Sequence, residues 1–322
     1  MIKGLFVLTF AIALVSLGLV TGANASEDIP DQYPVSALYS KPVEVIPNVF
    51  SAIGATAPPT HENSGHNNNL SFILTGAGVV VVNGGGSWQL AEALHTEIKT
   101  TTDQPVRLII NENGQGHAML GNSYWRAQGV KIVAHADTAA EFEERGHDIL
   151  DSAQQVQKEK ADKTDVVAPD ETFEDKYIVT FGDFPIQVLD LGPAHSPGDV
   201  VVWLPKQSLA IAGDMAFHER LLPIFEDTDT ASWVESWNDN FEPLKATYVI
   251  PGHGHPTNMA QLRRYTHDYL VYLRARIAEH LDKGGTLKDV YYVDQSPYAH
   301  LDTFEQLATR NAGRVYVQME FE

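Results

Sequence analysis

Four times in this chain an apolar, strand-like run leads into a glycine-containing turn that carries a histidine or an aspartate. The ends of neighbouring strands can meet at one rim of a sheet, and glycine lets the backbone turn tightly there. The side chains that follow the runs at 106–110, 186–191, 209–212 and 248–250 are His117, His195, Asp214 and His253. The pattern therefore predicts a sheet-based fold with its functional centre at the strand ends.

The order of the predicted elements narrows the fold class. Alternating and short apolar runs predict strands at 43–46, 49–53, 70–74 and 79–82, and later at 177–180, 186–191, 200–204, 209–212 and 248–250. Apolar residues three or four positions apart predict helices at 88–100, 138–145, 231–244 and 258–283. Elements in the order β-rich, βαβα, β-rich and βα favour two packed sheets with helices outside. We therefore predict an α/β chain folded as a four-layer αββα sandwich.

The first residues have the composition of an export signal. Lys3 precedes the apolar run 5–20, and Ala23-Asn24-Ala25 is a small-x-small cleavage site. An uncleaved anchor is the alternative. We expect residues 1–25 to be a signal peptide, and the mature protein to be periplasmic or secreted, with no membrane association after cleavage.

The rest of the chain is expected to divide into three parts. Residues 26–42 are a polar, proline-containing leader, and 43–283 form the main domain. Within it, 147–176 is rich in glutamine, lysine and acidic residues, which indicates an insertion that is either a lid or a solvated surface helix. Residues 284–322 are expected to be a C-terminal extension packed on the domain.

Composition restricts the chemistry. The chain has no cysteine, so thiolate nucleophiles, cysteine-ligated zinc and iron–sulfur clusters are excluded, and any transition-metal site must use histidine and carboxylate donors. The net charge of −20 makes nucleic acid an unsuitable partner, because its phosphates would be repelled. We expect a small-molecule substrate instead.

From about residue 43 to 255, the order and spacing of these motifs resemble the metallo-β-lactamase superfamily. Its first metal motif reads T-H-x-H-x-D-H and is followed two residues later by Gly-Asn, which aligns here with 112–118 ahead of 121–122. In that alignment Asn113 and Gln115 replace the first two histidines, His117 replaces the aspartate, and Ala118 replaces the last histidine. A narrower similarity, in 213–217 and 311–320, is to periplasmic hydrolases linked to sulfur and quinoprotein metabolism.

The resemblance implies two metal pockets, of which only one keeps its ligands. His195, Asp214 and His253 match the family's later ligands position by position. The pocket of Asn113, Gln115 and His195 offers two neutral amides, which are poor transition-metal ligands. The pocket of His117, Asp214 and His253 offers three ligands, which leaves the open position expected of a catalytic zinc.

A single zinc ion is therefore the expected cofactor, with iron or manganese as alternatives that suit the same donors. The resemblance implies a hydrolase that uses a metal-activated water on an ester, thioester, lactone, amide or similar bond. His195 would then polarise a carbonyl or shuttle a proton, and Asn113 and Gln115 would donate hydrogen bonds to an oxyanion.

Two other interpretations remain open. The first is a metal-poor or metal-free member of the fold that binds a small molecule or a protein without turning it over. The second is a redox or sulfur-transfer role with iron. His61 and His66, in a polar loop expected over the same rim, are either replacement ligands or substrate contacts, or else exposed loop histidines.

Overall fold

The computed structural model describes residues 33–182, 184–320 and 322. The predicted signal peptide and the start of the predicted leader lie outside these residues. Within the described residues, every helix is too short or too polar to cross a lipid bilayer.

Two sheets form the centre of the molecule. The first has seven strands in chain order, β1 (Val43–Ile46), β2 (Val49–Ala52), β3 (Leu70–Leu74), β4 (Val79–Val82), β5 (Val106–Ile110), β6 (Lys131–His135) and β7 (Glu171–Phe173). The second has five strands in the order β12 (Tyr248–His253), β11 (Leu209–Phe217), β10 (Val200–Leu204), β9 (Phe184–Asp190) and β8 (Lys176–Phe181). Both sheets are mixed: β4 to β7 are parallel, as are β11 and β12, and the other pairings are antiparallel.

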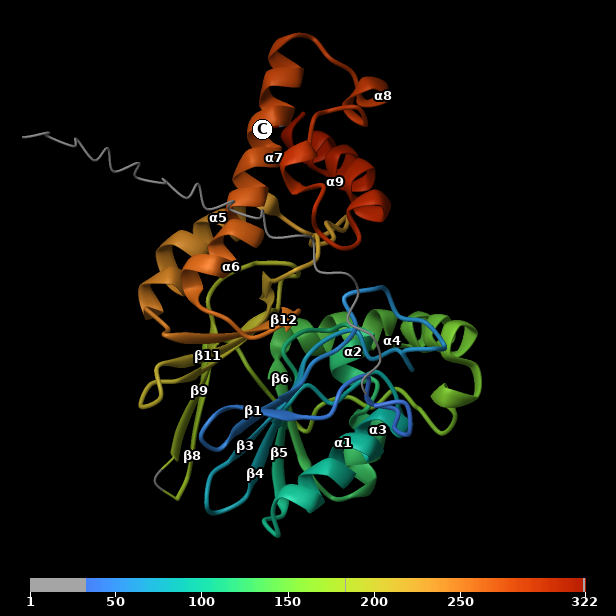
Figure 1. The fold of residues 1–322 in the computed structure, drawn as a ribbon, viewed down its shortest axis with the longest axis vertical. Helices are drawn as coiled ribbons and strands as arrows, with labels where there is room; N and C mark the ends of the chain where they lie inside the picture. Colours follow the sequence, from blue (N-terminus) through green and yellow to red (C-terminus); the bar gives the residue numbers. More distant parts are fainter. Residues whose placement is uncertain (1–32, 183, 321) are drawn as a thin grey trace, which may run out of the picture.

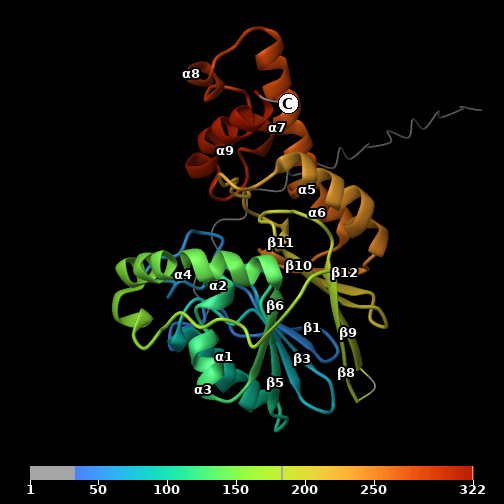
Figure 2. The ribbon, with the colours of Figure 1, turned by 180° about the vertical axis from the view of Figure 1, so that it is seen from behind.

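The two sheets pack face to face, with helices on their outer faces (Figures 1 and 2). Strand β4 shows why, because successive side chains of a strand point to opposite faces. Val80 and Val82 join the core between the sheets, whereas Val79 and Val81 join the core beneath helices α1 (Trp88–Thr101) and α3 (Asn122–Ala127). The predicted four-layer αββα sandwich is confirmed.

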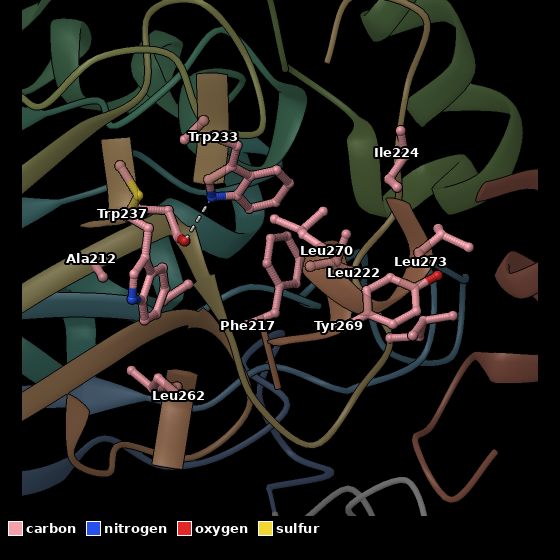
Figure 3. Packing of buried hydrophobic residues seen from close by; sticks show 14 of the residues in the cluster. Ala212, Phe217, Leu222, Ile224, Trp233, Trp237, Leu262, Tyr269, Leu270 and Leu273 are labelled. Atoms are coloured by element: carbon pink, nitrogen blue, oxygen red, sulfur yellow. Dashed lines mark hydrogen bonds between the residues drawn. The ribbon is translucent and has the colours of Figure 1, made fainter. Parts of the chain in front are cut away.

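The outer face of the second sheet carries the largest apolar core (Figure 3). Strand β11 supplies Ala212 and Phe217, and helix α5 (Thr230–Ser236) supplies Trp233, whose indole nitrogen donates to the carbonyl of Met215. Trp237, in the π turn that continues α5, is also fully buried. This core fixes the position of β11, which carries Asp214.

The helix predicted over 258–283 is in fact two helices. Helix α6 (Met259–Tyr265) ends before Thr266, and α7 (His267–Asp282) begins after it. The Thr266 hydroxyl accepts from the backbone nitrogen of Phe217 at 2.9 Å and donates to its carbonyl at 3.0 Å. A contact from β11 therefore breaks a helix that local periodicity predicts to be continuous.

Thr266→Val should lower the free energy of unfolding by about 1–3 kcal/mol, because it leaves a buried backbone N–H without a partner. Urea denaturation of both proteins measures this difference. Thr96→Val is the control, because the exposed Thr96 hydroxyl bonds only the carbonyl of Glu92, one turn back in α1. An equal loss in the two variants would contradict the role given to Thr266.

The segment predicted as an insertion, 147–176, has no boundary at its start. Helix α4 (Ala136–Gln157) runs through residue 147 without a break, although the sequence pattern predicts helix only over 138–145. Phe142 and Leu150 pack on helix α2 (Gly116–Met119), and β7 is the last strand of the first sheet. The segment thus extends the layers of the main domain, and its function as a lid stays a prediction.

The last residues pack on the second sheet's helices. Helices α8 (Leu287–Val290) and α9 (Phe304–Met319) lie with α7 at one end of the molecule (Figure 1). The final apolar stretch is part of α9, whose Leu307, Ala312 and Val315 join the core around Trp233.

Candidate metal centre

The three predicted ligands come from both sheets, but of the three only His253 ends a strand, because β11 runs on to Phe217, beyond its predicted end at 212. His117 lies in α2, which begins six residues after β5. Asp214 lies within β11, and His253 is the last residue of the adjacent parallel strand β12. Residue 252 has to be glycine for Asp214 to keep this position, because a Cβ atom on residue 252 would lie 2.3 Å from Asp214 Oδ1.

The structure brings these side chains together around one point. One ligand atom each of His117, Asp214 and His253 lies within 4.8 Å of the other two. His253 Nε2 is 3.3 Å from Asp214 Oδ1, and His117 Nε2 is 3.7 Å from Asp214 Oδ2. All three side chains are at most 9% exposed. Because zinc bonds are about 2.0–2.2 Å long, these side chains would have to move slightly closer together to bind one zinc ion.

The hydrogen bonding of His253 leaves its Nε2 atom available to bind a metal ion. Its Nδ1 lies 2.5 Å from the carbonyl oxygen of Asn67, which can only accept, so Nδ1 carries the proton. The lone pair is therefore on Nε2, which faces Asp214. A backbone carbonyl that orients a histidine in this way is common around protein metal sites.

The charges in this cluster are strongly coupled. Burial alone would raise the pKa of Asp214, but His253, His117 and His195 together hold it well below its ordinary value. Burial lowers the pKa of His253 to about 4, against the opposing effect of Asp214. Asp214 is therefore ionised and His253 neutral at neutral pH, which are the protonation states that bind a metal. The pKa of His117 is raised, because the effect of burial is outweighed by Asp214 and Glu112, so metal binding there has to release a proton.

Unsatisfied polar atoms provide a test of whether a cation fits. Among the described residues, His117 Nε2 and Asp214 Oδ1 are buried without a hydrogen-bond partner. Such atoms are rare in folded proteins and need an explanation. Both belong to residues whose ligand atoms lie within 4.8 Å of one another, so a divalent cation held there would satisfy them. The donors present fit the group that they are predicted to hold.

His195 lies beside this cluster and not within it. Its Nδ1 is 2.7 Å from Gln115 Nε2 and 3.6 Å from Asp214 Oδ2. Because the Gln115 amide donates, Nδ1 accepts and the proton is on Nε2. Burial lowers the pKa of His195, which favours the neutral form. The structure therefore gives Gln115 the role of orienting His195.

Asn113 has a different position from the one expected for an oxyanion donor. It is fully buried, its amide donates to Asp214 Oδ2 at 3.2 Å, and its side-chain oxygen accepts from the backbone nitrogen of Gln115 at 3.1 Å. Asn113 therefore orients Asp214 through this hydrogen bond. It does not line the cavity described next.

A cavity of about 370 Å³ opens over the three ligands and His195. The predicted loop histidines lie elsewhere. His66 is fully buried, its Nδ1 accepts from the backbone nitrogen of Tyr39, and burial lowers its pKa to about 3. His61 pairs with Glu159 at 2.8 Å on the surface. The same loop instead lines the cavity with Pro58, Pro59, Gly65 and Asn67.

Glu112 is a residue of this site that sequence reasoning missed. It is 2% exposed, accepts from the Asn83 amide at 2.8 Å, and places Oε1 at 3.4 Å from His117 Nε2. Its other oxygen lies where a Cβ atom on residue 213 would be, at 1.3 Å, so only glycine fits there. The signal that could have found Glu112 is Asn83, which stands directly after the strand run 79–82 where many members of the resembled family have aspartate.

Comparison with known proteins agrees with the fold and the site. The family model of the metallo-beta-lactamase superfamily matches residues 116–253, which include all four strand-end donors. The metallo-beta-lactamase type 2 of Bacteroides fragilis is 29% identical over 170 residues, or 51% of this chain. This chain covers 57% of the length of that relative.

Solved structures share the architecture at lower identity. A metallo-beta-lactamase from Pontibacter korlensis aligns with a TM-score of 0.59 at 22% identity, covering 71% of this chain and 98% of that one. A double mutant of the sec-alkyl sulfatase PisA1 aligns with a TM-score of 0.69 at 16% identity, covering 88% of this chain and 52% of that one.

The sandwich, the strand-end donors and these matches support membership of the metallo-β-lactamase superfamily, whose family model covers residues 116–253. Compared with the pattern of that family, this chain is divergent. Its first metal motif has Asn113 and Gln115 in place of two histidines, and His117 in place of the aspartate.

Proposed function

We propose that this protein is a hydrolase that binds one divalent metal ion, most suitably zinc, on His117, Asp214 and His253. The observation that carries the proposal is the convergence of three buried donor atoms within 4.8 Å, two of them from side chains with unsatisfied polar atoms. Iron and manganese accept the same donor types, so elemental analysis has to identify the metal.

When bound, a divalent ion would polarise the substrate and make water nucleophilic at neutral pH. The chain's own residues would orient the reactants. Asn113 holds Asp214, and the carbonyl of Asn67 holds His253. Gln115 fixes the tautomer of His195, so that Nε2–H can donate to an oxygen of the substrate that gains negative charge.

The bond that is cleaved belongs to a small molecule. The relatives include proteins named as a lactamase and as a sec-alkyl sulfatase. The substrate panel should therefore contain esters, thioesters, lactones, amides and sulfate or phosphate esters. Purified full-length protein should contain about one metal ion per chain and hydrolyse at least one member of this panel. A folded protein that takes up no metal would support the binding-protein alternative instead.

We also propose that the protein is exported, on the basis of Lys3, the apolar run 5–20 and the site Ala23-Asn24-Ala25. Expression in a bacterial host should yield periplasmic protein that lacks residues 1–25, as intact mass spectrometry will show. A chain that keeps its first residues in the membrane fraction would contradict this proposal.

Restoring the two missing histidines should create a second metal site. The variant Asn113→His/Gln115→His completes, with His195, the three-histidine pocket that the family resemblance implies. We expect the metal content measured by elemental analysis to rise from about one to about two ions per chain. Asn113→Ala/Gln115→Ala is the matched control and should stay at or below one. A wild-type protein that already binds two ions would contradict the one-metal proposal.

A further inference from the structure

The cavity above the metal centre has one apolar wall. Helix α4 contributes Ile149, Ala153 and Val156, which are four and three residues apart and therefore lie on one face of the helix. Leu120, Pro223, Phe225 and Leu307 continue this wall from other elements. Val156 and Phe225 are 41% and 37% exposed, so large apolar side chains border an open cavity. A wall of this kind binds the apolar part of a small molecule.

The charged residues of the same lining are unusual for this chain. Acidic residues outnumber lysine and arginine by 42 to 22 in the whole sequence. Yet the charged side chains that line the cavity, apart from its histidines, are Asp214 and two arginines, Arg220 and Arg310. Since Asp214 belongs to the metal centre, the part of the lining outside that centre carries positive charge.

Arg310 is the arginine that can reach a ligand. It lies one turn after Leu307 in α9, so an apolar and a cationic side chain of the same helix face the cavity together. In the part of the chain that the structure describes, Arg310 forms no ion pair. Arg314, one turn further on, pairs with Glu226 at 2.5 Å. Arg220 is buried, with its guanidinium 3.4 Å from His253 Nδ1.

We propose that the cavity binds amphiphilic anions: small molecules with an apolar chain or ring along α4 and an anionic group at Arg310. This substrate class rests on the proposed hydrolase function, because the bond to be cleaved would then lie near Asp214. The C-terminal helix α9 thus takes part in substrate recognition, although it lies outside the predicted catalytic domain.

The test uses full-length protein, both treated with chelator and loaded with zinc. Isothermal titration calorimetry measures the Kd of butanoate, hexanoate, octanoate and octan-1-ol. Each added methylene should tighten carboxylate binding by about three-fold, because apolar surface is buried along α4. Octanoate should bind about five-fold tighter than octan-1-ol to the chelator-treated protein, where only the protein's own cations can recognise the carboxylate.

Two pairs of variants separate the apolar wall from the cation. Arg310→Gln should abolish the preference for octanoate over octan-1-ol, whereas Arg314→Gln, the matched loss of a paired arginine, should change each Kd by less than two-fold. Ala153→Glu should weaken octanoate binding by at least ten-fold. Gln155→Glu adds the same charge to an exposed position of α4 outside the lining and should leave the Kd within two-fold.

The proposal is overturned if chain length does not change the Kd, or if Arg310→Gln leaves the preference for the carboxylate intact. Thermal denaturation of each variant shows that it is folded. Chelator-treated protein that binds octanoate as expected, but takes up no zinc, would support this substrate class and contradict the proposed hydrolase. Zinc uptake and hydrolysis, without chain-length dependence of the Kd, would support the proposed hydrolase and contradict this substrate class.

Discussion

Asp214→Ala should reduce the metal content of the purified protein from about one ion per chain to less than about 0.1. Asp214 is the only carboxylate among the three donors, and it contacts both His117 and His253. Losing a residue that merely orients a ligand weakens metal binding by about 10–100-fold, so losing a ligand should cost more than about 100-fold. Elemental analysis and competition with a chromogenic chelator measure both quantities.

The control for this variant is a carboxylate that also lies near a histidine but is outside the cavity. Asp190 ends β9, and its Oδ2 lies 3.8 Å from His135 Nε2. Asp190→Ala should keep the full metal content. If Asp214→Ala also retained one ion per chain, the metal would have to bind elsewhere, and the centre described above would be wrong.

Gly213→Ala should lower the free energy of unfolding by about 3–5 kcal/mol, a large share of the roughly 5–15 kcal/mol typical of a folded domain. Two effects add. The residue has φ of +54°, where a side chain costs about 1–2 kcal/mol. The new methyl group would also lie 1.3 Å from Glu112 Oε2, so the buried carboxylate must move. Urea denaturation of chelator-treated protein measures the change.

Gly129→Ala isolates the backbone effect, because Gly129 has φ of +73° and a Cβ atom added there would meet no other atom within 4 Å. Gly129→Ala should lower the free energy of unfolding by only about 1–2 kcal/mol. The double variant Gly213→Ala/Glu112→Ala should recover at least about 1 kcal/mol relative to the sum of the single changes, because the clash is then absent. Equal losses for the two glycine variants would show that Glu112 does not lie beneath residue 213.

Much of the fold could be predicted from local pattern. The bounds expected for β1, β3, β4, β5 and β10 match the structure. In all of these except the more exposed β1, most residues are buried, which gives each short apolar run a recognisable composition. Helix boundaries were less predictable. Thr266 interrupts a periodic helix only because Phe217, 49 residues earlier, supplies backbone partners for its hydroxyl. Helix α4 extends to Gln157, beyond the predicted end at 145, with Phe142 and Leu150 packed on α2.

At the candidate metal centre, too, some features follow from the sequence and others depend on tertiary contacts. The sequence by itself determined the donor types, since a chain without cysteine has only histidine and carboxylate to offer, and it indicated which strand-like runs they accompany. Tertiary structure decided which donors share a point: His117, Asp214 and His253 converge, and His195 is held aside by Gln115. It also turned Asn113 towards Asp214 and placed Glu112 beneath Gly213. The physical reason is that, apart from the pair Asp214 and His253 on adjacent strands, these contacts join residues 80 to 101 positions apart that belong to different sheets. Their geometry therefore exists only once the two sheets have packed.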